Sequence, residues 1–348
     1  MAHKPLTYAD AGVNVAAWNK AKDGIGKLVS STYNDRVLGA FGQFGGLFDI
    51  SYLKEYDHPV LVSSIDGVGT KVKIAAQTGI HDFVGEDIVN HCIDDILVMG
   101  ARPLFFLDYI GIGRLEGNIL DTIVAGLARA CKQSHLVLIG GETAEMPDVY
   151  SPGEYDLAGT IVGVIEKNAI LEGNDIIPGD TIIGFRSNGL HTNGYTLARK
   201  IVTEIAGRSY GDTLDVTGKT FAEELLRPHK SYAALHEAIR TDAVKGCAHI
   251  TGGGFADNIA RVLPSNCDAR IDTRTWKPDS IFTFMQRNAG VATEEMYRTF
   301  NMGIGFVIIV DRKSRDSILA TKGVLKSQPV IIGEITAGNG SVKLEYAQ

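Results

Sequence analysis

A carboxylate, two glycines and a lysine stand close together in residues 61–71, which read LVSSIDGVGTK. An apolar run typical of a strand ends at Asp66, and Gly67 and Gly69 follow it. Thr70 and Lys71 then open a helix-like stretch. Mg²⁺ prefers carboxylate oxygens and shares its coordination with substrate phosphates, while glycines admit a ligand close to the backbone and a helix start attracts anions. The segment predicts a site for Mg²⁺ and a polyphosphate; a tight turn with solvated side chains is the simpler alternative.

Further acidic side chains stand at the ends of apolar runs in the first half of the chain. Residues 136–147 read LVLIGGETAEMP, and a two-glycine turn after residue 139 would place Glu142 at a strand terminus, where it suits a metal ligand or a general base. Asp94, Asp95, Asp108 and Glu145 have similar settings. Each alone is explained as well by a solvated turn or a helix N-cap. Together they favour a Mg²⁺ site.

The second half offers a histidine and a glycine triplet. Residues 189–195 read GLHTNGY before a helix, and His191 suits proton transfer near neutral pH, although a lone histidine is more often structural. Residues 249–255 read HITGGGF and enter another helix. Thr251 with its three glycines predicts a phosphate cradle, with a flexible turn as the alternative. Arg298 lies between aromatic residues, as a ligand clamp or a packed surface side chain.

The two commonest nucleotide-binding motifs are missing. The P-loop pattern G-x-x-x-x-G-K-[ST] fails because Ala21 and Thr213 occupy the first glycine position ahead of the two Gly-Lys pairs. The dinucleotide pattern G-x-G-x-x-G fails because Glu116 stands at its third glycine. Any ATP must therefore be held by another scaffold.

Composition sets wide limits on the class of protein. The chain has 348 residues, of which 45% are hydrophobic and 40 are glycine, so it is globular with about two domains. Its net charge of −7 argues against a nucleic-acid partner. No apolar run is long enough to span a membrane and no signal peptide opens the chain, which predicts a cytoplasmic protein. The four dispersed cysteines are expected to be reduced and buried.

Hydrophobic periodicity predicts alternating strands and helices, and hence an α/β (α+β) fold with two domains, residues 1–170 and 171–348. In the first half we expect helices at 15–29, 70–78, 83–99 and 118–133, and strands at 59–66, 103–112, 136–139 and 155–165. Residues 37–48 predict a strand that ends in a flexible glycine loop. In the second half we expect strands at 181–186, 268–272, 303–310 and 329–335, helices at 193–206, 220–240 and 254–262, and a polar insertion at 207–219.

Taken in chain order, these segments closely resemble the phosphoribosylformylglycinamidine cyclo-ligase family, also called aminoimidazole ribonucleotide synthetase, of purine biosynthesis. The resemblance covers nearly the whole chain. The ordered series is specific, although no single segment is. The matching segments are residues 8–13, 41–48, 66–71, 103–109, 140–147, 153–159, 191–195, 251–255 and 295–301.

The resemblance implies a ligase that forms a C–N bond in an ATP-dependent ring closure. The amide oxygen of formylglycinamidine ribonucleotide attacks the γ-phosphate, an amidine nitrogen attacks the activated carbon, and phosphate leaves. The products are 5-aminoimidazole ribonucleotide, ADP and phosphate. The resemblance also implies ATP and Mg²⁺ as cofactors, homodimers formed through the N-terminal sheets, and an N-terminal α/β domain and a C-terminal α+β domain with the site in the cleft between them.

Carried onto this chain residue by residue, the resemblance implies roles for the residues above. Lys71 and His191 are the implied catalytic residues, and the glycine loop at 42–46 is implied to be a mobile flap over ATP. The implied metal ligands are Asp66, Asp95 and Glu142. The implied ATP-binding residues are Gly42, Phe44, Gly45, Gly46, Asp66, Gly67, Gly69, Thr70, Lys71, Asp95, Gly141 and Glu142. The implied substrate-binding residues are His191, Asn193, Thr251, Gly252, Gly253 and Gly254.

The chain departs from the family pattern in three places. Asp94 stands where the family usually has Asn, which adds a negative charge beside a predicted metal ligand. Gln43 interrupts the usual double glycine at Gly42. Gly26 replaces the family's N-terminal lysine, with Lys27 one residue later, so no role is assigned to Lys27.

Other functions remain as alternatives at this point. One is another phosphoryl-transfer enzyme of the same superfamily, such as a thiamine-monophosphate kinase; another is a catalytically silent metabolite-binding homologue. A selenophosphate synthetase is disfavoured because no cysteine precedes Cys92, and a glutamine amidotransferase because no cysteine–histidine pair is recognisable.

Overall fold

The computed structural model describes residues 15–114 and 117–346, so the matching segment at residues 8–13 lies outside the described residues. The chain divides into two compact units. The first comprises the described part of Met1–Asp57 with Ser63–Cys92 and Pro103–Val162; the second comprises His58–Val62, Ile93–Arg102 and Gly163–Gln348. Each unit therefore uses separated stretches of chain. The domain boundary at residue 170 stays a prediction.

A four-stranded sheet, in the order β1-β4-β2-β3, organises the first unit. Its strands are β1 (Pro59–Gly67), β2 (Arg102–Ile112), β3 (Val137–Glu145) and β4 (Tyr155–Glu166). Side chains alternate between its two faces. Phe106 and Ile110 of β2 are fully buried on one face, whereas Leu107 and Tyr109 between them are exposed on the other. One face of the sheet is thus covered and the other is open.

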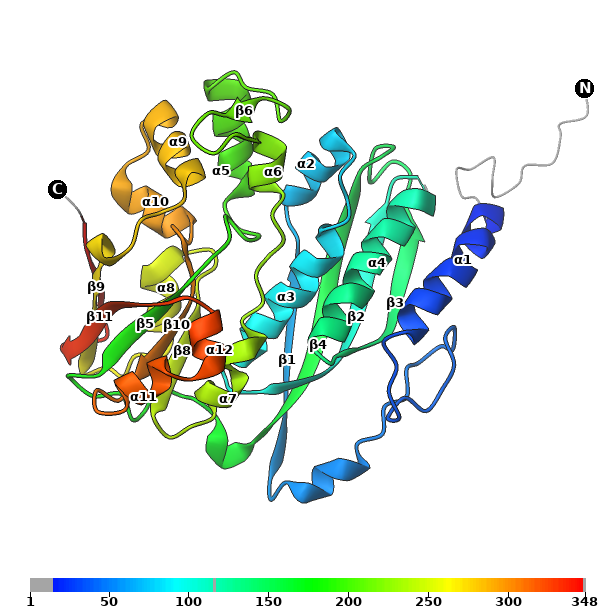
Figure 1. The fold of residues 1–348 in the computed structure, drawn as a ribbon. Helices are drawn as coiled ribbons and strands as arrows, with labels where there is room; N and C mark the ends of the chain where they lie inside the picture. Colours follow the sequence, from blue (N-terminus) through cyan, green and yellow to red (C-terminus); the bar gives the residue numbers. More distant parts are fainter. Residues whose placement is uncertain (1–14, 115–116, 347–348) are drawn as a thin grey trace, which may run out of the picture. The chain divides into compact units, whose positions relative to one another are not determined.

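Helices cover the buried face of this sheet. The helices of this region are α1 (Val15–Ser30), α2 (Lys71–Thr78), α3 (Val84–Leu97) and α4 (Gly117–Gln133), with a short 3-10 turn at Ser51–Glu55; α3 and α4 pack on the sheet. In Figure 1, α4 runs along the sheet and α1 lies beside α4. Helix α3 approaches closely because Gly159 of β4 has no side chain. A Cβ there would lie 2.1 Å from Phe106 and 2.9 Å from Ile88.

The expected helices and strands of the first half are present, but two local predictions are wrong. Residues 37–48 form no strand; they contribute a single antiparallel bridge between Val37 and Phe48. Strand β3 does not end at the glycine pair 140–141 but continues to Glu145, paired in parallel with β2. The reason is steric, since a Cβ on Gly141 would lie 2.2 Å from Asp108 Oδ1. The glycines permit close strand pairing here, and Glu142 lies within the strand rather than at its end.

A six-stranded sheet, in the order β12-β9-β11-β5-β10-β8, organises the second unit. Its strands are β5 (Thr181–Arg186), β8 (Val244–His249), β9 (Cys267–Asp272), β10 (Ile304–Val310), β11 (Pro329–Ala337) and β12 (Val342–Glu345). Neighbours pair antiparallel except β12 with β9. A small hairpin, β6 (Thr213–Leu214) with β7 (Lys219–Thr220), occupies the predicted polar insertion.

The helices of the second unit are short. They are α5 (Tyr195–Lys200), followed by a π-helical turn at Ile201–Ile205, α6 (Phe221–Leu225), α7 (His236–Ile239), α8 (Gly254–Ala260), α9 (Ser280–Ala289), α10 (Thr293–Thr299), α11 (Arg315–Leu319) and α12 (Lys322–Lys326). Side chains of α7, α11 and α12 share a buried core with Phe185 of β5 and Phe306 of β10. Strands β5, β9, β10 and β11 and helices α5 and α8 were predicted from the sequence, whereas β8, β12, α9, α10, α11 and α12 were not. The predicted helical region at 220–240 is interrupted, because only α6 and α7 with a short 3-10 turn form there.

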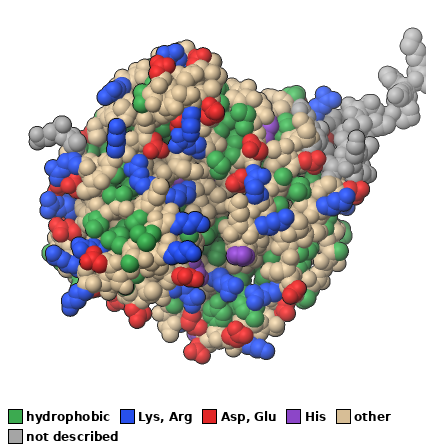
Figure 2. All heavy atoms as spheres, viewed as in Figure 1, with side chains coloured by type: hydrophobic (Ala, Val, Ile, Leu, Met, Phe, Trp, Pro, Cys, Tyr) green, Lys and Arg blue, Asp and Glu red, His purple; other side chains and the backbone are tan. Residues whose placement is uncertain are grey.

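The surface and the cysteines fit the composition. Figure 2 shows one face, on which lysine and arginine side chains lie among acidic ones. All four cysteines are buried free thiols, as expected. Among the described residues, no helix has the length and apolar character needed to cross a bilayer.

Candidate functional site

A pocket in the first unit brings several predicted ATP-binding residues together. Its volume is about 370 Å³, in the range of small-molecule sites. The loop at residues 39–47 forms one side, and Leu107, Asp108 and residues 139–142 of β2 and β3 form the other. We call this the glycine-loop pocket. It contains the predicted residues Gly42, Phe44, Gly45, Gly46, Gly141 and Glu142.

Glycine is required at specific points of this pocket. Gly42 has φ of +91°, a conformation that residues with a Cβ rarely adopt. A Cβ on Gly46 would lie 2.6 Å from the Ile139 side chain. Gly45 has no atom within 4 Å of its Cβ position, and the Phe44 ring is fully exposed. The loop is therefore conformationally restricted at Gly42, closely packed at Gly46 and exposed between them. These features suit a loop that covers a ligand.

Asp108 gives the pocket an unusual carboxyl group. Burial and, to a smaller extent, the nearby Glu142 carboxylate raise its pKa to about 7, against a backbone hydrogen bond that lowers it. Asp108 thus binds a proton at a pH where an exposed aspartate is fully ionised. The sequence analysis noted it only as one of several acids.

Asp66 is held by a buried histidine. Its side chain is 46% exposed, and its Oδ2 lies 2.8 Å from His91 Nε2. Its other oxygen accepts a hydrogen bond of 2.6 Å from the Gly67 N–H. An oriented carboxylate with an open face suits a metal ligand. The sequence analysis missed His91, although its position in the apolar helix α3, three residues before Asp94, was a usable signal.

Lys71 lies in a setting different from the one its motif suggested. Both Lys71 and Asp87 have fully buried side chains, and Lys71 Nζ lies 2.9 Å from both Asp87 oxygens. Burial lowers the pKa of Lys71, while the Asp87 charge opposes that shift. In this arrangement the ammonium group neutralises Asp87 rather than a ligand. A contact with phosphate stays a prediction, and it would require Lys71 to leave this pair.

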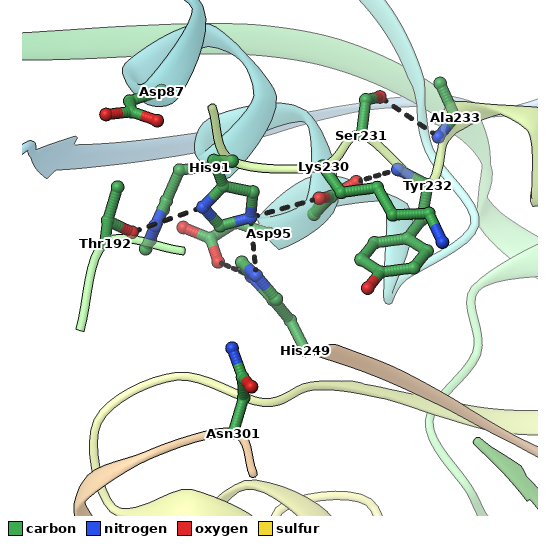
Figure 3. Close-up of polar contacts among 12 residues, drawn as sticks. Asp87, His91, Asp95, Thr192, Lys230, Ser231, Tyr232, Ala233, His249 and Asn301 are labelled. Carbon is green, nitrogen blue, oxygen red and sulfur yellow. Dashed lines mark hydrogen bonds and ion pairs between the residues drawn. The ribbon is translucent and has the colours of Figure 1, made fainter. Parts of the chain in front are cut away.

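A chain of polar side chains in the second unit contains the predicted ligand Asp95. Its carboxylate Oδ1 lies 2.9 Å from His249 Nδ1, and His249 Nε2 lies 3.2 Å from His229 Nε2. His229 Nδ1 in turn lies 3.2 Å from Thr192 Oγ1. Figure 3 shows Asp95 and His249 pointing toward one another. We call Thr192, His229, His249 and Asp95 the histidine chain.

Asp94 is buried beside this chain. Its side chain has no exposure, its Oδ1 accepts a 2.8 Å hydrogen bond from the Tyr232 N–H, and its Oδ2 lies 3.4 Å from His229 Nε2. Burial raises the pKa of Asp94 well above the ordinary value, and the Asp95 charge adds to the shift. Lys230 acts in the opposite direction on Asp94.

The predicted substrate residues of the second unit are only partly assembled. Asn193 Oδ1 accepts a 3.0 Å hydrogen bond from the Gly252 N–H, so these two predicted residues lie together. His191 is buried and stacks on His229 with ring centroids 4.1 Å apart. It contributes to the packing of the histidine chain, and proton transfer by His191 stays a prediction.

Hydrogen bonds within residues 251–258 already hold the glycine triplet in place. The Gly254 N–H donates to the Thr251 carbonyl, and the Asn258 side-chain amide donates to the carbonyls of Thr251, Gly252 and Gly254. Because two backbone N–H groups, at 252 and 254, already have partners, the loop offers fewer donors to a phosphate than the sequence suggested. The cradle therefore stays a prediction.

Comparison with known families defines the class of protein. The family described as "AIR synthase related protein, N-terminal domain" matches residues 50–165, and the one described as "AIR synthase related protein, C-terminal domain" matches residues 178–345. Solved structures share the fold. A thiamine-monophosphate kinase from Stenotrophomonas maltophilia K279a superposes with a TM-score of 0.66 at 17% identity, covering 92% of this chain and 94% of that one. The hydrogenase maturation protein HypE in complex with ATP gives 0.68 at 15%, covering 97% and 94%.

Full-length relatives narrow this class to one family. A phosphoribosylformylglycinamidine cyclo-ligase from Alkaliphilus metalliredigens is 44% identical over 345 residues, 99% of each chain. One from Trichlorobacter lovleyi is 46% identical over 336 residues, 96% of each chain. The chain belongs to the phosphoribosylformylglycinamidine cyclo-ligase family, which confirms the resemblance and the two-domain α/β fold inferred from the sequence.

Proposed function

We propose that this enzyme catalyses the ATP-dependent cyclisation of formylglycinamidine ribonucleotide to 5-aminoimidazole ribonucleotide, ADP and phosphate, a step of purine biosynthesis. The observation that carries the proposal is identity of 44–46% to cyclo-ligases across nearly the full length of both chains. The likeness to an ATP-bound HypE structure supports nucleotide binding by the fold. The thiamine-monophosphate kinase alternative is not favoured, because its likeness is limited to fold at 17% identity.

The chemistry requires charge neutralisation at the γ-phosphate and a folded substrate. Phosphoryl transfer depends mainly on positioning and on electrostatic stabilisation. In our proposal the glycine-loop pocket binds and covers ATP. His191, Asn193 and residues 251–254 contact the ribonucleotide, and Lys71 supports the nucleotide site from its buried pair with Asp87.

Mg²⁺ is the cofactor that the donor set suits. Asp66, Asp95 and Glu142 are hard oxygen ligands of the kind that Mg²⁺ prefers, and all three carboxylates are exposed or partly exposed. Asp66 and Asp95 each have a histidine that orients the carboxylate. Bound Mg²⁺ would neutralise charge on the transferred phosphoryl group.

The deciding measurement is ADP release with and without formylglycinamidine ribonucleotide, in wild type and in Asp66→Asn. We expect substrate-dependent release that needs Mg²⁺ and falls at least about a hundredfold in the variant, as electrostatic phosphoryl-transfer sites commonly show. Asp57→Asn, an exposed aspartate away from the motif, is the control. Equal turnover in Asp66→Asn would reject the metal assignment, and turnover with thiamine monophosphate instead would select the kinase alternative.

We also propose a homodimer formed through the open face of the first sheet. Ile65 of β1 is 71% exposed, and Leu107 and Tyr109 of β2, two strands away across the sheet, are exposed as well. Sedimentation should show a dimer that Leu107→Arg dissociates and that Val216→Arg, at an exposed apolar residue of the second unit, leaves intact. A monomeric wild type would reject this proposal.

We also propose a cytoplasmic location, because the four buried cysteines are free thiols and a reducing compartment keeps thiols in that state.

A further inference from the structure

The histidine chain contains a constraint on proton positions. His229 Nε2 and His249 Nε2 lie 3.2 Å apart. Two ring nitrogens at this distance form a hydrogen bond only when one of them carries a proton and the other does not. The two rings are 1% and 5% exposed, so bulk water does not replace the bond.

The neighbours of each ring decide which nitrogen carries that proton. The Asp95 carboxylate is an acceptor 2.9 Å from His249 Nδ1, so His249 carries its proton on Nδ1 and leaves Nε2 as an acceptor. His229 then donates from Nε2. Its Nδ1 becomes an acceptor, which the Thr192 hydroxyl group 3.2 Å away supplies with a donor. Each of the hydrogen bonds from Thr192 through His229 and His249 to Asp95 is therefore satisfied when both histidine rings are neutral.

Asp94 favours the same proton position. Its Oδ2 lies 3.4 Å from His229 Nε2, while its Oδ1 is occupied by the Tyr232 N–H. In its ionised form Asp94 favours a proton on that nitrogen, because Oδ2 then faces Nε2 as an acceptor, whereas burial opposes this ionisation.

We propose that His229 is a positioning residue, whose Nε2–H, held between His249 and Asp94, fixes the ring of His249 and through it the carboxylate of Asp95. Groups behind a metal ligand commonly set its orientation in this way. The inference deepens the proposed function, because it rests on Asp95 serving the Mg²⁺–ATP site. His229 itself touches no reacting atom in this proposal.

Two substitutions distinguish the role of the Nε2 atom of His229 from that of its Nδ1 atom. In His229→Gln the side-chain amide can reach the Nε2 position and donate to His249, whereas in His229→Asn it is shorter and reaches only the Nδ1 position. His229→Ala removes both. His236→Gln is the matched control, because His236 is a half-buried histidine of the same unit whose Nε2 has no hydrogen-bond partner among the described residues.

The kinetic readout is kcat and the KM for each substrate. Since outer groups of metal sites typically contribute 10- to 100-fold, we expect kcat/KM for ATP to fall about tenfold or more in His229→Ala and His229→Asn, and by less than about threefold in His229→Gln. The KM for formylglycinamidine ribonucleotide should change equally in His229→Asn and His229→Gln, because both lose the ring that stacks on His191. A difference between these two variants that is confined to ATP is one that a general loss of structure would not produce. Wild-type kinetics in His229→Ala, or no rescue by a folded His229→Gln, would overturn the proposal.

A second readout needs no activity. In ¹⁵N-histidine-labelled wild type, the side-chain nitrogen spectrum should show His249 protonated at Nδ1 and His229 at Nε2. Asp94→Asn should shift the His229 proton toward Nδ1, because the amide N–H₂ would then face Nε2 as a donor. His249 protonated at Nε2 in wild type would overturn the proposal. Failure of wild type to cyclise the substrate would reject the proposed function while leaving this spectrum as a separate test.

Discussion

The glycine-loop pocket of the first unit and the histidine chain of the second are built in opposite ways. The pocket is lined mainly by two short stretches, residues 39–47 and 139–142, together with Tyr33, Val37 and two residues of β2. Its polar groups are backbone atoms, the carboxyl groups of Asp108 and Glu142, and the side chains of Gln43 and Tyr33. The histidine chain joins four residues from separate parts of the sequence, positions 95, 192, 229 and 249, in a buried setting.

This difference explains which residues a sequence reveals. Binding through the backbone demands glycine, and glycines clustered over a few residues are visible as a motif. Binding through oriented side chains requires no local pattern, because packing supplies the neighbours. The Lys71–Asp87 pair is the intermediate case, in which the lysine belongs to a motif but its partner lies 16 residues away.

The largest effect is expected at that buried pair. Lys71→Met should lower the free energy of unfolding by about 3–5 kcal/mol, because it leaves the Asp87 carboxylate buried without its counter-charge. Urea unfolding measures this loss. The double variant Lys71→Met, Asp87→Leu should recover most of it, since neither charge then remains. A Lys71→Met protein of normal stability that has lost ADP release would instead support direct contact between Lys71 and phosphate.

A smaller effect is expected in the glycine-loop pocket. Gly141→Ala places a Cβ 2.2 Å from Asp108 Oδ1, so β2 and β3 must shift, at a cost of about 1–3 kcal/mol. ATP binding should weaken with it, as measured by nucleotide titration. Gly211→Ala is the matched control, because Gly211 lies outside the pocket and the nearest atom to its Cβ position, Ser209 Oγ, is 3.9 Å away. Equal ATP affinity in both variants would show that the glycine-loop pocket is not the nucleotide-binding site.

A third effect is a dependence of stability on pH. Folding raises the pKa of Asp108 from 3.8 to about 7. The unfolded chain releases this proton first, so the group lowers stability progressively as the pH rises from about 4 to about 7. Asp108→Asn should remove that slope, and the variant should gain stability over wild type as the pH rises, in urea unfolding between pH 5 and pH 8.

Asp268→Asn is the opposite control for this measurement. Hydrogen bonds from Lys343 and from the N–H groups of Asn339 and Ser341 lower the pKa of Asp268 to about 2. Its stabilising effect is complete above the unfolded pKa near 4 and is lost only as the pH falls toward 2. The difference between Asp268→Asn and wild type should therefore stay constant from pH 5 to pH 8. A slope there would contradict the assignment.

The elements that could be predicted are those with a strong local signal. An apolar run marked β2, and helical periodicity marked α3 and α4, so their type and approximate ends were correct. Strand β8 was missed because its sequence, VKGCAH, has no clear alternation and owes its burial to β10. The glycine pair in β3 was interpreted as a turn, because only the neighbouring Asp108 explains why glycine is needed within a strand.

The sequence by itself determined the family, the order of most elements and the glycine positions of the pocket, because these depend on local conformation and on patterns of residue type. The tertiary structure alone decided the partners of the charged groups. It paired Lys71 with Asp87 and Asp66 with His91, and it placed His229 beside Asp94. A buried charge takes its partner from whatever element packs against it, and the strength of that pairing depends on distance and burial rather than on separation along the chain.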